Sequence, residues 1–344
     1  MRIAITADPY LPVPPRLYGG IERVIDLLVR GLVARGHEVT LFAHPASTTS
    51  ARLRPYGVPP HTSRAARARE LAQVGAGLWN LRGAVDVVHS FGRLAAMLPI
   101  LPLRSVPKIQ SYQRPVPWAG VRQAARLAGG SLLFTGCSTS LYSPAPDEGA
   151  GRWRTIFNGV DVRRYTPTTH VASDAPLAFL GRVERIKGPH HAIAIARQAG
   201  RRLVIAGNVA TGGEDARFYE QEIAPHVDGD RVTYVGSVDD EQKNALLRQS
   251  AALLMPIEWD EPFGIVMAEA FACGTPVIAF RRGSVAEIVE DGRTGFHCST
   301  IDEAAAAVSR LATIDRAVVR ARCERRFSHD AIVTAYEQLY TELA

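Results

Sequence analysis

The chain has 344 residues, of which 47% are hydrophobic and 22% are charged, and its formal net charge is +6. These values are typical of a globular protein, and the length suffices for two domains that each bury a core. No run approaches 18 apolar residues and the first residues do not resemble a signal peptide, so we expect a cytoplasmic protein without a membrane span. The four scattered cysteines are expected to be reduced thiols.

Charge is distributed unevenly along the chain. Residues 1–165 carry 21 Lys and Arg against 9 Asp and Glu, a net charge of +12, whereas the remainder carries 19 against 25. This asymmetry indicates an anionic partner for the first half, either a soluble anionic acceptor or an acidic membrane surface with a lipid-linked acceptor. The alternative is an arginine-rich surface that water alone solvates. The arginines concerned are at positions 52, 54, 64, 67, 69, 122 and 126.

Short apolar runs alternate with helical stretches in both halves, which predicts an α/β fold with parallel sheets covered on both faces. Strands are expected at Ile3–Ala7, Val39–Ala43, Val85–His89, Lys108–Tyr112, Leu132–Thr135, Thr155–Phe157, Leu177–Leu180, Leu203–Ala206, Val232–Val235, Ala252–Met255 and Val277–Phe280. Helices are expected at 20–35, 189–200, 215–225, 239–250, 264–273 and 328–343, and residues 45–82 show little pattern.

A turn-rich stretch from Asn158 to Pro176 predicts a domain junction near residue 170. The expected organisation is two Rossmann-like domains, 1–169 and 170–327, followed by a helix at 328–344. Ligands of such sheets bind outside the carboxyl ends of the strands, so we expect a cleft between the domains to hold them.

Three motifs follow expected strands. Gly19 and Gly20 precede the first helix, where glycine permits close backbone approach and the helix start favours an anion; a tight turn is the alternative. Arg182 and Lys187 lie in the loop Gly181–Gly188, where both cations could meet phosphate or simply be solvated.

The third motif is a pair of glutamates, Glu261 and Glu269, around a predicted helix start. With Pro262 as the first helical residue, the amides of Phe263, Gly264 and Ile265 would be free donors for phosphate. Glu269 would then lie about 7.5 Å further along the helix, about the reach from a phosphate of a sugar nucleotide to its ribose. The alternative is an amphipathic helix with two solvated glutamates.

The stretch from Glu261 to Ala270, together with Cys273-Gly274-Thr275-Pro276 and Gly292-Arg293-Thr294-Gly295-Phe296, resembles family 4 of the retaining GT-B glycosyltransferases. The resemblance extends from Tyr18-Gly19-Gly20 to the final helix. It implies that a nucleotide sugar binds with Glu269 on the ribose, Arg182 and Lys187 on the diphosphate and Glu261 on the sugar, and that the final helix packs on the first domain.

One position departs from the family pattern. Gln113 stands where family members often carry a histidine near the acceptor, and it cannot carry charge or shuttle a proton. Arg114 could supply the missing cation, and His89, at another strand end, is expected either to contact the acceptor or to pack.

We expect no metal and no cofactor, because the one D-x-D match, Asp228-Gly229-Asp230, precedes a strand and contains a turn glycine. No nucleic-acid partner is expected. The alternatives to a transferase are a sugar-nucleotide epimerase, and a binding protein without turnover, which Gln113 would favour. The sequence does not identify the base, the sugar, the acceptor or the oligomeric state.

Overall fold

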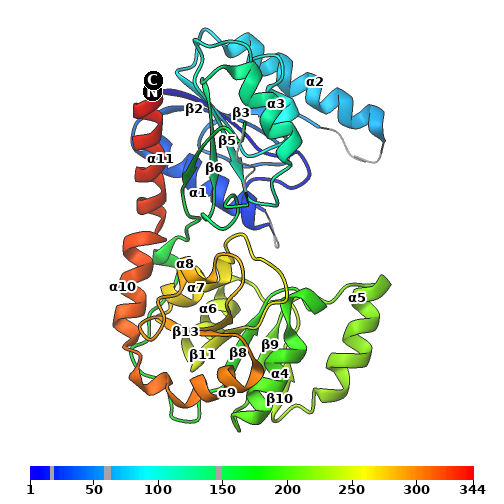
Figure 1. Cartoon of the computed structure of the whole chain (residues 1–344), viewed down its shortest axis with the longest axis vertical. Coiled ribbons are helices and arrows are strands. Elements are labelled where there is room, and N and C mark those ends of the chain that lie inside the picture. Colours follow the sequence, from blue (N-terminus) through cyan, green and yellow to red (C-terminus); the bar gives the residue numbers. More distant parts are fainter. Residues whose placement is uncertain (16–18, 58–62, 145–148) are drawn as a thin grey trace. The chain divides into compact units, whose positions relative to one another are not determined.

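The structure, a computed structural model, describes residues 1–15, 19–57, 63–144 and 149–344. The described residues form two compact units: Met1–Gly159 with His329–Ala344, and Val160–Ser328 (Figure 1). The junction thus lies about ten residues before the expected one. The segment after it packs on the second unit, where Val160 N–H donates to Phe327 O and Thr168 N–H donates to Cys273 O.

The first unit is built on a parallel sheet with the order β3-β2-β1-β4-β5-β6-β7 among the described residues. Its strands are β1 (Arg2–Thr6), β2 (Glu38–Ala43), β3 (Arg52–Pro55), β4 (Val87–Ser90), β5 (Lys108–Tyr112), β6 (Leu132–Gly136) and β7 (Arg152–Thr155). Its helices are α1 (Gly20–Ala34), α2 (Arg64–Leu81), α3 (Trp118–Ala128) and α11 (His329–Leu343). Figure 1 shows α2 and α3 on one face of the sheet and α1 with α11 on the other.

The last helix, α11, packs closely on α1. Gly31 permits this approach, because a Cβ there would lie 2.4 Å from Cγ2 of Val333. Glu337 of α11 pairs with Arg35 at 2.7 Å and with His37 at 2.8 Å. The C-terminal helix is therefore part of the first unit, although the whole second unit separates it from α1 in the sequence.

The second unit is built on a parallel sheet with the order β10-β9-β8-β11-β12-β13. Its strands are β8 (Leu177–Leu180), β9 (Leu203–Ala206), β10 (Val232–Tyr234), β11 (Ala252–Met255), β12 (Val277–Phe280) and β13 (Gly295–Cys298). Its helices are α4 (Pro189–Gln198), α5 (Gly213–Phe218), α6 (Asp240–Gln249), α7 (Ile265–Ala272), α8 (Val285–Ile288), α9 (Ile301–Ser309) and α10 (Arg316–Arg326).

The two sheets confirm the predicted fold class. The sequence pattern missed the edge strands β3 and β13 and the helices α2, α3, α8, α9 and α10, and it placed β7 at Thr155–Phe157 instead of Arg152–Thr155. The helix expected at 215–225 is a short α5 followed by one π-helical turn over Tyr219–Ile223.

The strand order reverses between β1 and β4 in the first unit and between β8 and β11 in the second. Loops that leave the carboxyl ends of neighbouring strands diverge at such a point, and ligands of α/β sheets bind there. The sequence motifs lie at these two points.

Candidate functional site

The second unit places the Arg182–Lys187 loop beside the segment that contains Glu261. The loop follows β8 and the segment follows β11, and β8 and β11 are paired neighbours in the sheet. The backbone N–H of Glu258 donates to Ile186 O at 2.9 Å, which ties the two loops together. Gly188 is required here, because a Cβ at its φ of 73° would lie 2.0 Å from Pro256 O.

Lys187 and Glu261 form an ion pair. The Nζ of Lys187 lies 2.6 Å from Oε2 of Glu261, and the two side chains are 19% and 12% exposed. Trp259 completes the cluster: its Nε1–H donates to the same oxygen at 3.1 Å, and Nζ of Lys187 lies 4.6 Å from the ring centroid. The cation thus lies between a carboxylate and an aromatic face.

Arg182 extends from the same loop and pairs with the carboxylate of Glu184. Burial raises the pKa of Glu184, and the Arg182 guanidinium opposes this rise. The structure therefore gives both cations predicted to meet the diphosphate a carboxylate partner within the second unit.

The helix start differs from the one that the sequence predicted. α7 begins at Ile265 with Gly264 as its N-cap, so Pro262 and Phe263 lie in the preceding loop and not in the first turn. Gly264 has φ 70°, and a Cβ there would lie 2.7 Å from Cε of Met255, so glycine is the residue that fits. Among the described residues, the N–H groups of Gly264, Ile265 and Val266 have no hydrogen-bond acceptor, whereas Met267 N–H donates to Gly264 O. The free donors are thus shifted by one residue from the predicted set.

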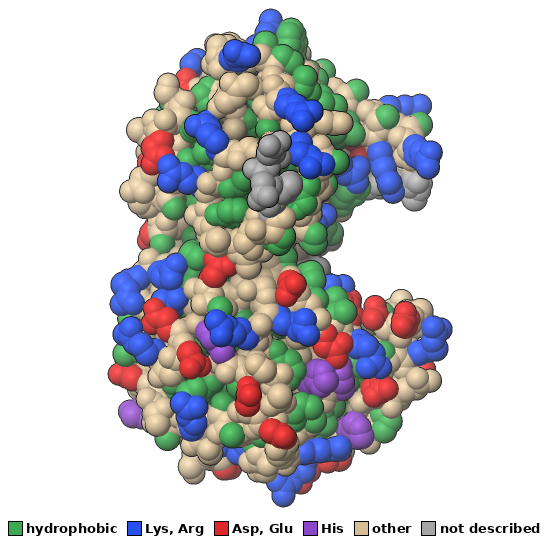
Figure 2. All heavy atoms as spheres, in the orientation of Figure 1, with side chains coloured by type: hydrophobic (Ala, Val, Ile, Leu, Met, Phe, Trp, Pro, Cys, Tyr) green, Lys and Arg blue, Asp and Glu red, His purple; other side chains and the backbone are tan. Residues whose placement is uncertain are grey.

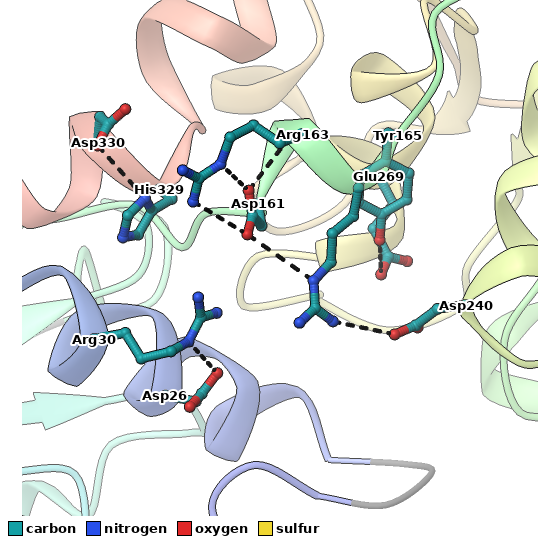
Figure 3. A network of polar contacts seen from close by, with 10 residues as sticks. Asp26, Arg30, Asp161, Arg163, Tyr165, Asp240, Glu269, His329 and Asp330 are labelled. Carbon is teal, nitrogen blue, oxygen red and sulfur yellow. Dashed lines mark hydrogen bonds and ion pairs between the residues drawn. The ribbon is translucent and has the colours of Figure 1, made fainter. Parts of the chain in front are cut away.

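Glu269 lies one turn into α7 and is only 5% exposed. Its Oε1 accepts hydrogen bonds from the hydroxyl of Tyr165 at 2.9 Å (Figure 3) and from Nζ of Lys243 at 2.6 Å. Burial raises the pKa of Tyr165, and the neighbouring carboxylate adds to the effect, so this hydroxyl stays a donor. Lys243 also pairs with Asp240 at 3.2 Å. The hydrogen bonds from Tyr165 and Lys243 to Glu269 thus both end on Oε1.

In the first unit, Gly19 and Gly20 lie at the start of α1, as predicted, with Gly19 as N-cap at φ 152°. A Cβ on Gly19 would lie 2.9 Å from Oε2 of Glu22, whereas one on Gly20 would meet nothing within 4 Å. Tyr18, the first residue of this motif, lies outside the described residues.

Two carboxylates, Asp8 and Glu22, lie near the glycine loop. Asp8 follows β1, and burial raises the pKa of both groups. Arg114, which follows β5, approaches Asp8 at 3.9 Å and keeps 64% of its side chain exposed.

Gln113 accepts a hydrogen bond from Nδ2 of Asn158 at 2.6 Å on its Oε1. Its Nε2 is buried and has no hydrogen-bond partner among the described residues. The side-chain amide of Gln113 is therefore bonded through its oxygen only, among the described residues.

His89 is fully buried and has no surface with which to touch an acceptor. Its Nδ1 lies 2.6 Å from the hydroxyl of Tyr340 on α11, and its Nε2 lies 2.6 Å from the hydroxyl of Ser111 on β5. Burial lowers the pKa of His89 to about 3, so the ring is neutral at physiological pH. Of the two expectations for His89, the structure supports packing.

The D-x-D match forms a turn. The Oδ1 of Asp228 accepts from the N–H groups of Asp230 and Val232, both at 2.9 Å, as expected of a loop that leads into β10.

Sequence reasoning missed the partners that hold the predicted residues. Trp259, Tyr165 and Lys243 belong to no motif, and their roles depend on contacts that only folding creates. Asp8 carried a usable signal, because a carboxylate directly after an apolar strand lies at the ligand-binding edge of the sheet.

Comparison with known proteins covers both units. Residues 18–164 match the family model described as Glycosyltransferase Family 4, and residues 169–325 match that of Glycosyl transferases group 1. The chain is 27% identical to glycogen synthase of Mycobacterium tuberculosis over 402 aligned positions, which cover 99% of this chain and 94% of the relative.

Two solved structures share the architecture. AviGT4, a glycosyltransferase involved in avilamycin A biosynthesis, is 26% identical with a TM-score of 0.69, and the match covers 99% of this chain and 97% of that protein. Alr3699/HepE of Anabaena is 20% identical with a TM-score of 0.74 and coverage of 99% and 100%, a likeness of fold.

Proposed function

Since the chain belongs to family 4 of the GT-B glycosyltransferases, we propose that it transfers a sugar from a nucleoside diphosphate sugar to an acceptor, with retention of anomeric configuration and without a divalent metal. The observation that carries the donor assignment is Glu269, a buried carboxylate one turn beyond free helix N–H groups and in the same unit as the Lys187–Glu261 pair. Alr3699/HepE, which shares the fold, has been solved with UDP-glucose.

The nucleotide is proposed to bind along α7. The N–H groups of Ile265 and Val266 would hold a phosphate, because a helix N-terminus favours an anion. Four residues on, about 6 Å along the helix axis, Glu269 would accept hydrogen bonds from the ribose hydroxyls. Tyr165 and Lys243 already bind Oε1, so Oε2 is the oxygen assigned to the ribose.

The transfer step is assigned to the cations of the Gly181–Gly188 loop. The bond between the anomeric carbon and the diphosphate oxygen breaks, and the acceptor oxygen bonds to the same carbon. The acceptor's proton passes to the departing phosphate oxygen on the same face, so no side chain is needed as a base. Negative charge grows on the diphosphate as the bond breaks, and Lys187 and Arg182 would stabilise it there. Glu261, held by Trp259, would accept hydrogen bonds from sugar hydroxyls.

The acceptor is proposed to be bound by the first unit. Gln113 would donate from its unpartnered Nε2 to an acceptor or phosphate oxygen. An amide does this without a change of charge, which agrees with a mechanism in which the protein supplies no base.

The basic surface of the first unit favours an anionic acceptor or an acidic membrane surface. Arg64, Arg67 and Arg69 of α2 are exposed, and Figure 2 shows Lys and Arg side chains gathered at one end of this region. Trp79, near the end of the same helix, is 40% exposed and stacks under Arg82. Exposed basic side chains are attracted to an anionic surface, and a partly exposed tryptophan can lie at a membrane–water interface. No helix among the described residues is long and apolar enough to cross a bilayer.

Radiolabelled UDP-glucose, GDP-mannose and their ADP and dTDP counterparts test this proposal. With the cognate donor, slow release of free nucleoside diphosphate in water and retained configuration in the first sugar anomer, seen by NMR, are expected. An epimerised donor would identify an epimerase instead, and tight binding without product would identify a binding protein. The variant Lys187→Ala should bind donor but release little product, which excludes a contaminating hydrolase.

A further inference from the structure

Two adjacent histidines and a glutamate converge in the second unit on a point that the donor assignment does not use. His190 and His191 lie in the first turn of α4, and Glu258 follows β11. The Nε2 atoms of His190 and His191 lie 3.0 Å and 2.8 Å from the same oxygen, Oε1 of Glu258. All three ligand atoms lie within 4.8 Å of one another.

The fold holds these three side chains in place. Gly188 caps α4 in van der Waals contact with Pro256, and the N–H of Glu258 is bonded to Ile186 O at 2.9 Å. The rings are packed as well: His190 lies edge-on to Phe218 at 5.3 Å, and His191 lies 5.6 Å from Phe280. Little rearrangement is therefore needed to bring three donor atoms around one ion.

We propose that His190, His191 and Glu258 bind one Zn²⁺ ion or a similar transition-metal ion. Two imidazole nitrogens and one carboxylate oxygen form a donor set that zinc uses at about 2.0–2.2 Å, with a fourth position open to water. Two neutral imidazoles and a carboxylate carry one negative charge, which complements a divalent cation. Imidazole ligands favour zinc over magnesium or calcium, which prefer oxygen.

The metal would act on structure and not on the transfer step. Its three ligands do not include Lys187 or Glu261, so it is distinct from the metal-independent donor chemistry proposed above. It would join α4 to the loop that continues into Trp259 and Glu261. This link would restrict the backbone that carries Lys187 and Glu261, the ion pair of the donor site. Zinc binding should therefore raise the melting temperature while transfer survives chelation.

The test is calorimetric titration of the untagged, EDTA-stripped full chain with ZnCl₂, together with the visible spectrum of the Co²⁺ complex. We expect one zinc per chain and the intense absorption of four- or five-coordinate cobalt. His191→Ala and Glu258→Gln should each weaken zinc binding at least about tenfold, since even loss of a residue that only supports a ligand costs 10- to 100-fold. Magnesium at the same concentration should give no heat.

His226→Ala is the matched control, because His226 is a partly exposed histidine of the same unit that contacts Arg197 and is not part of this cluster. It should bind zinc like the wild type. All four cysteines are buried and do not offer a competing surface site. Equal zinc affinity in the wild type and Glu258→Gln would overturn the proposal, as would a wild-type cobalt spectrum like that of the free hexaaqua ion. The wild-type cobalt spectrum tests the proposal even if one of the variants does not fold.

Discussion

Replacement of Glu269 by alanine tests whether this carboxylate binds the ribose of the nucleotide. Hydrogen bonds to a charged group contribute about 1.5–3 kcal/mol each, so loss of the ribose contact should raise the Kd for a nucleoside diphosphate by about 10- to 150-fold. A second effect follows from burial, because Lys243 loses its 2.6 Å carboxylate partner, although it keeps its ion pair with Asp240. Breaking a buried ion pair costs about 3–5 kcal/mol, and the remaining carboxylate should hold the loss of stability near the lower value.

The assay separates these two effects. A thermal-shift panel of UDP, GDP, ADP and dTDP first selects the nucleotide, since a ligand at 100 times its Kd stabilises the fold by about 2.7 kcal/mol. Calorimetry then compares that nucleotide with its 2′-deoxy and 3′-deoxy analogues. The wild type should discriminate against at least one deoxy analogue, and Glu269→Ala should bind all three alike.

Asp240→Asn is the matched control, because it removes the other carboxylate from Lys243 and leaves Glu269 intact. It should leave nucleotide affinity within about twofold, an effect below 0.5 kcal/mol. If Glu269→Ala bound the nucleotide as tightly as the wild type, or still discriminated against the deoxy analogue, the ribose assignment would be refuted.

Four further outcomes follow from the structure. Arg182→Ala and Lys187→Ala should lower single-turnover rates more than donor affinity, because their partner gains charge only as the bond breaks; an unchanged rate with a raised Kd would contradict this. Excess EDTA should leave the transfer rate unchanged, and abolition of activity would show a catalytic metal. His89 is buried neutral with a pKa near 3, so the free energy of unfolding should fall as pH drops below about 6.5, where the unfolded histidine gains a proton; His89→Gln, measured by denaturant titration, should lack this component. Anionic liposomes should sediment the chain at low salt and release it at high salt, whereas Arg64→Glu with Arg67→Glu should not sediment; equal recovery with neutral liposomes would exclude the membrane surface.

The buried parallel strands could be predicted from the sequence because they are continuous apolar runs. β8, β9, β11 and β12 begin and end where the pattern places them. β3 could not be predicted in this way: Arg52–Pro55 is an edge strand, its one strand partner in the described part of the chain is β2, and its two arginines are exposed. β3 is held in the sheet by backbone hydrogen bonds to β2, and its exposed arginines interrupt the apolar run by which a buried strand is predicted.

The start of α7 shows a similar limit. Proline is common at the first position of a helix, and for this reason the sequence predicted that α7 begins at Pro262. The chain instead turns at Gly264, whose φ is 70°, and only glycine fits there because a Cβ would lie within 3 Å of the methyl groups of Met255 and Met267. The loop that contains Phe263 is fixed by a tertiary hydrogen bond, in which Ser284 Oγ donates to its carbonyl at 3.0 Å. That contact joins segments far apart in sequence.

The residue types of the donor site could be predicted, but their partners could not. Lys187 and Glu261 are 74 residues apart, and Tyr165 and Glu269 are 104 apart. Each motif alone is compatible with a solvated loop. For His89 the sequence left acceptor contact and packing open, because the partner that decides between them, Tyr340 of α11, comes from the far end of the chain.

The pairing of charges bears on how a diphosphate could bind. Arg182, Lys187 and Lys243 each have a carboxylate partner, so their charges are already balanced within the second unit. A bound diphosphate must therefore compete for these cations. The start of α7 contributes only about half a positive charge. Binding is then favourable if the displaced carboxylates find donors of their own, and sugar hydroxyls beside Glu261 and ribose hydroxyls beside Glu269 are such donors. On this reasoning a free diphosphate should bind more weakly than the complete nucleotide sugar, because it takes the cations and leaves the carboxylates without partners.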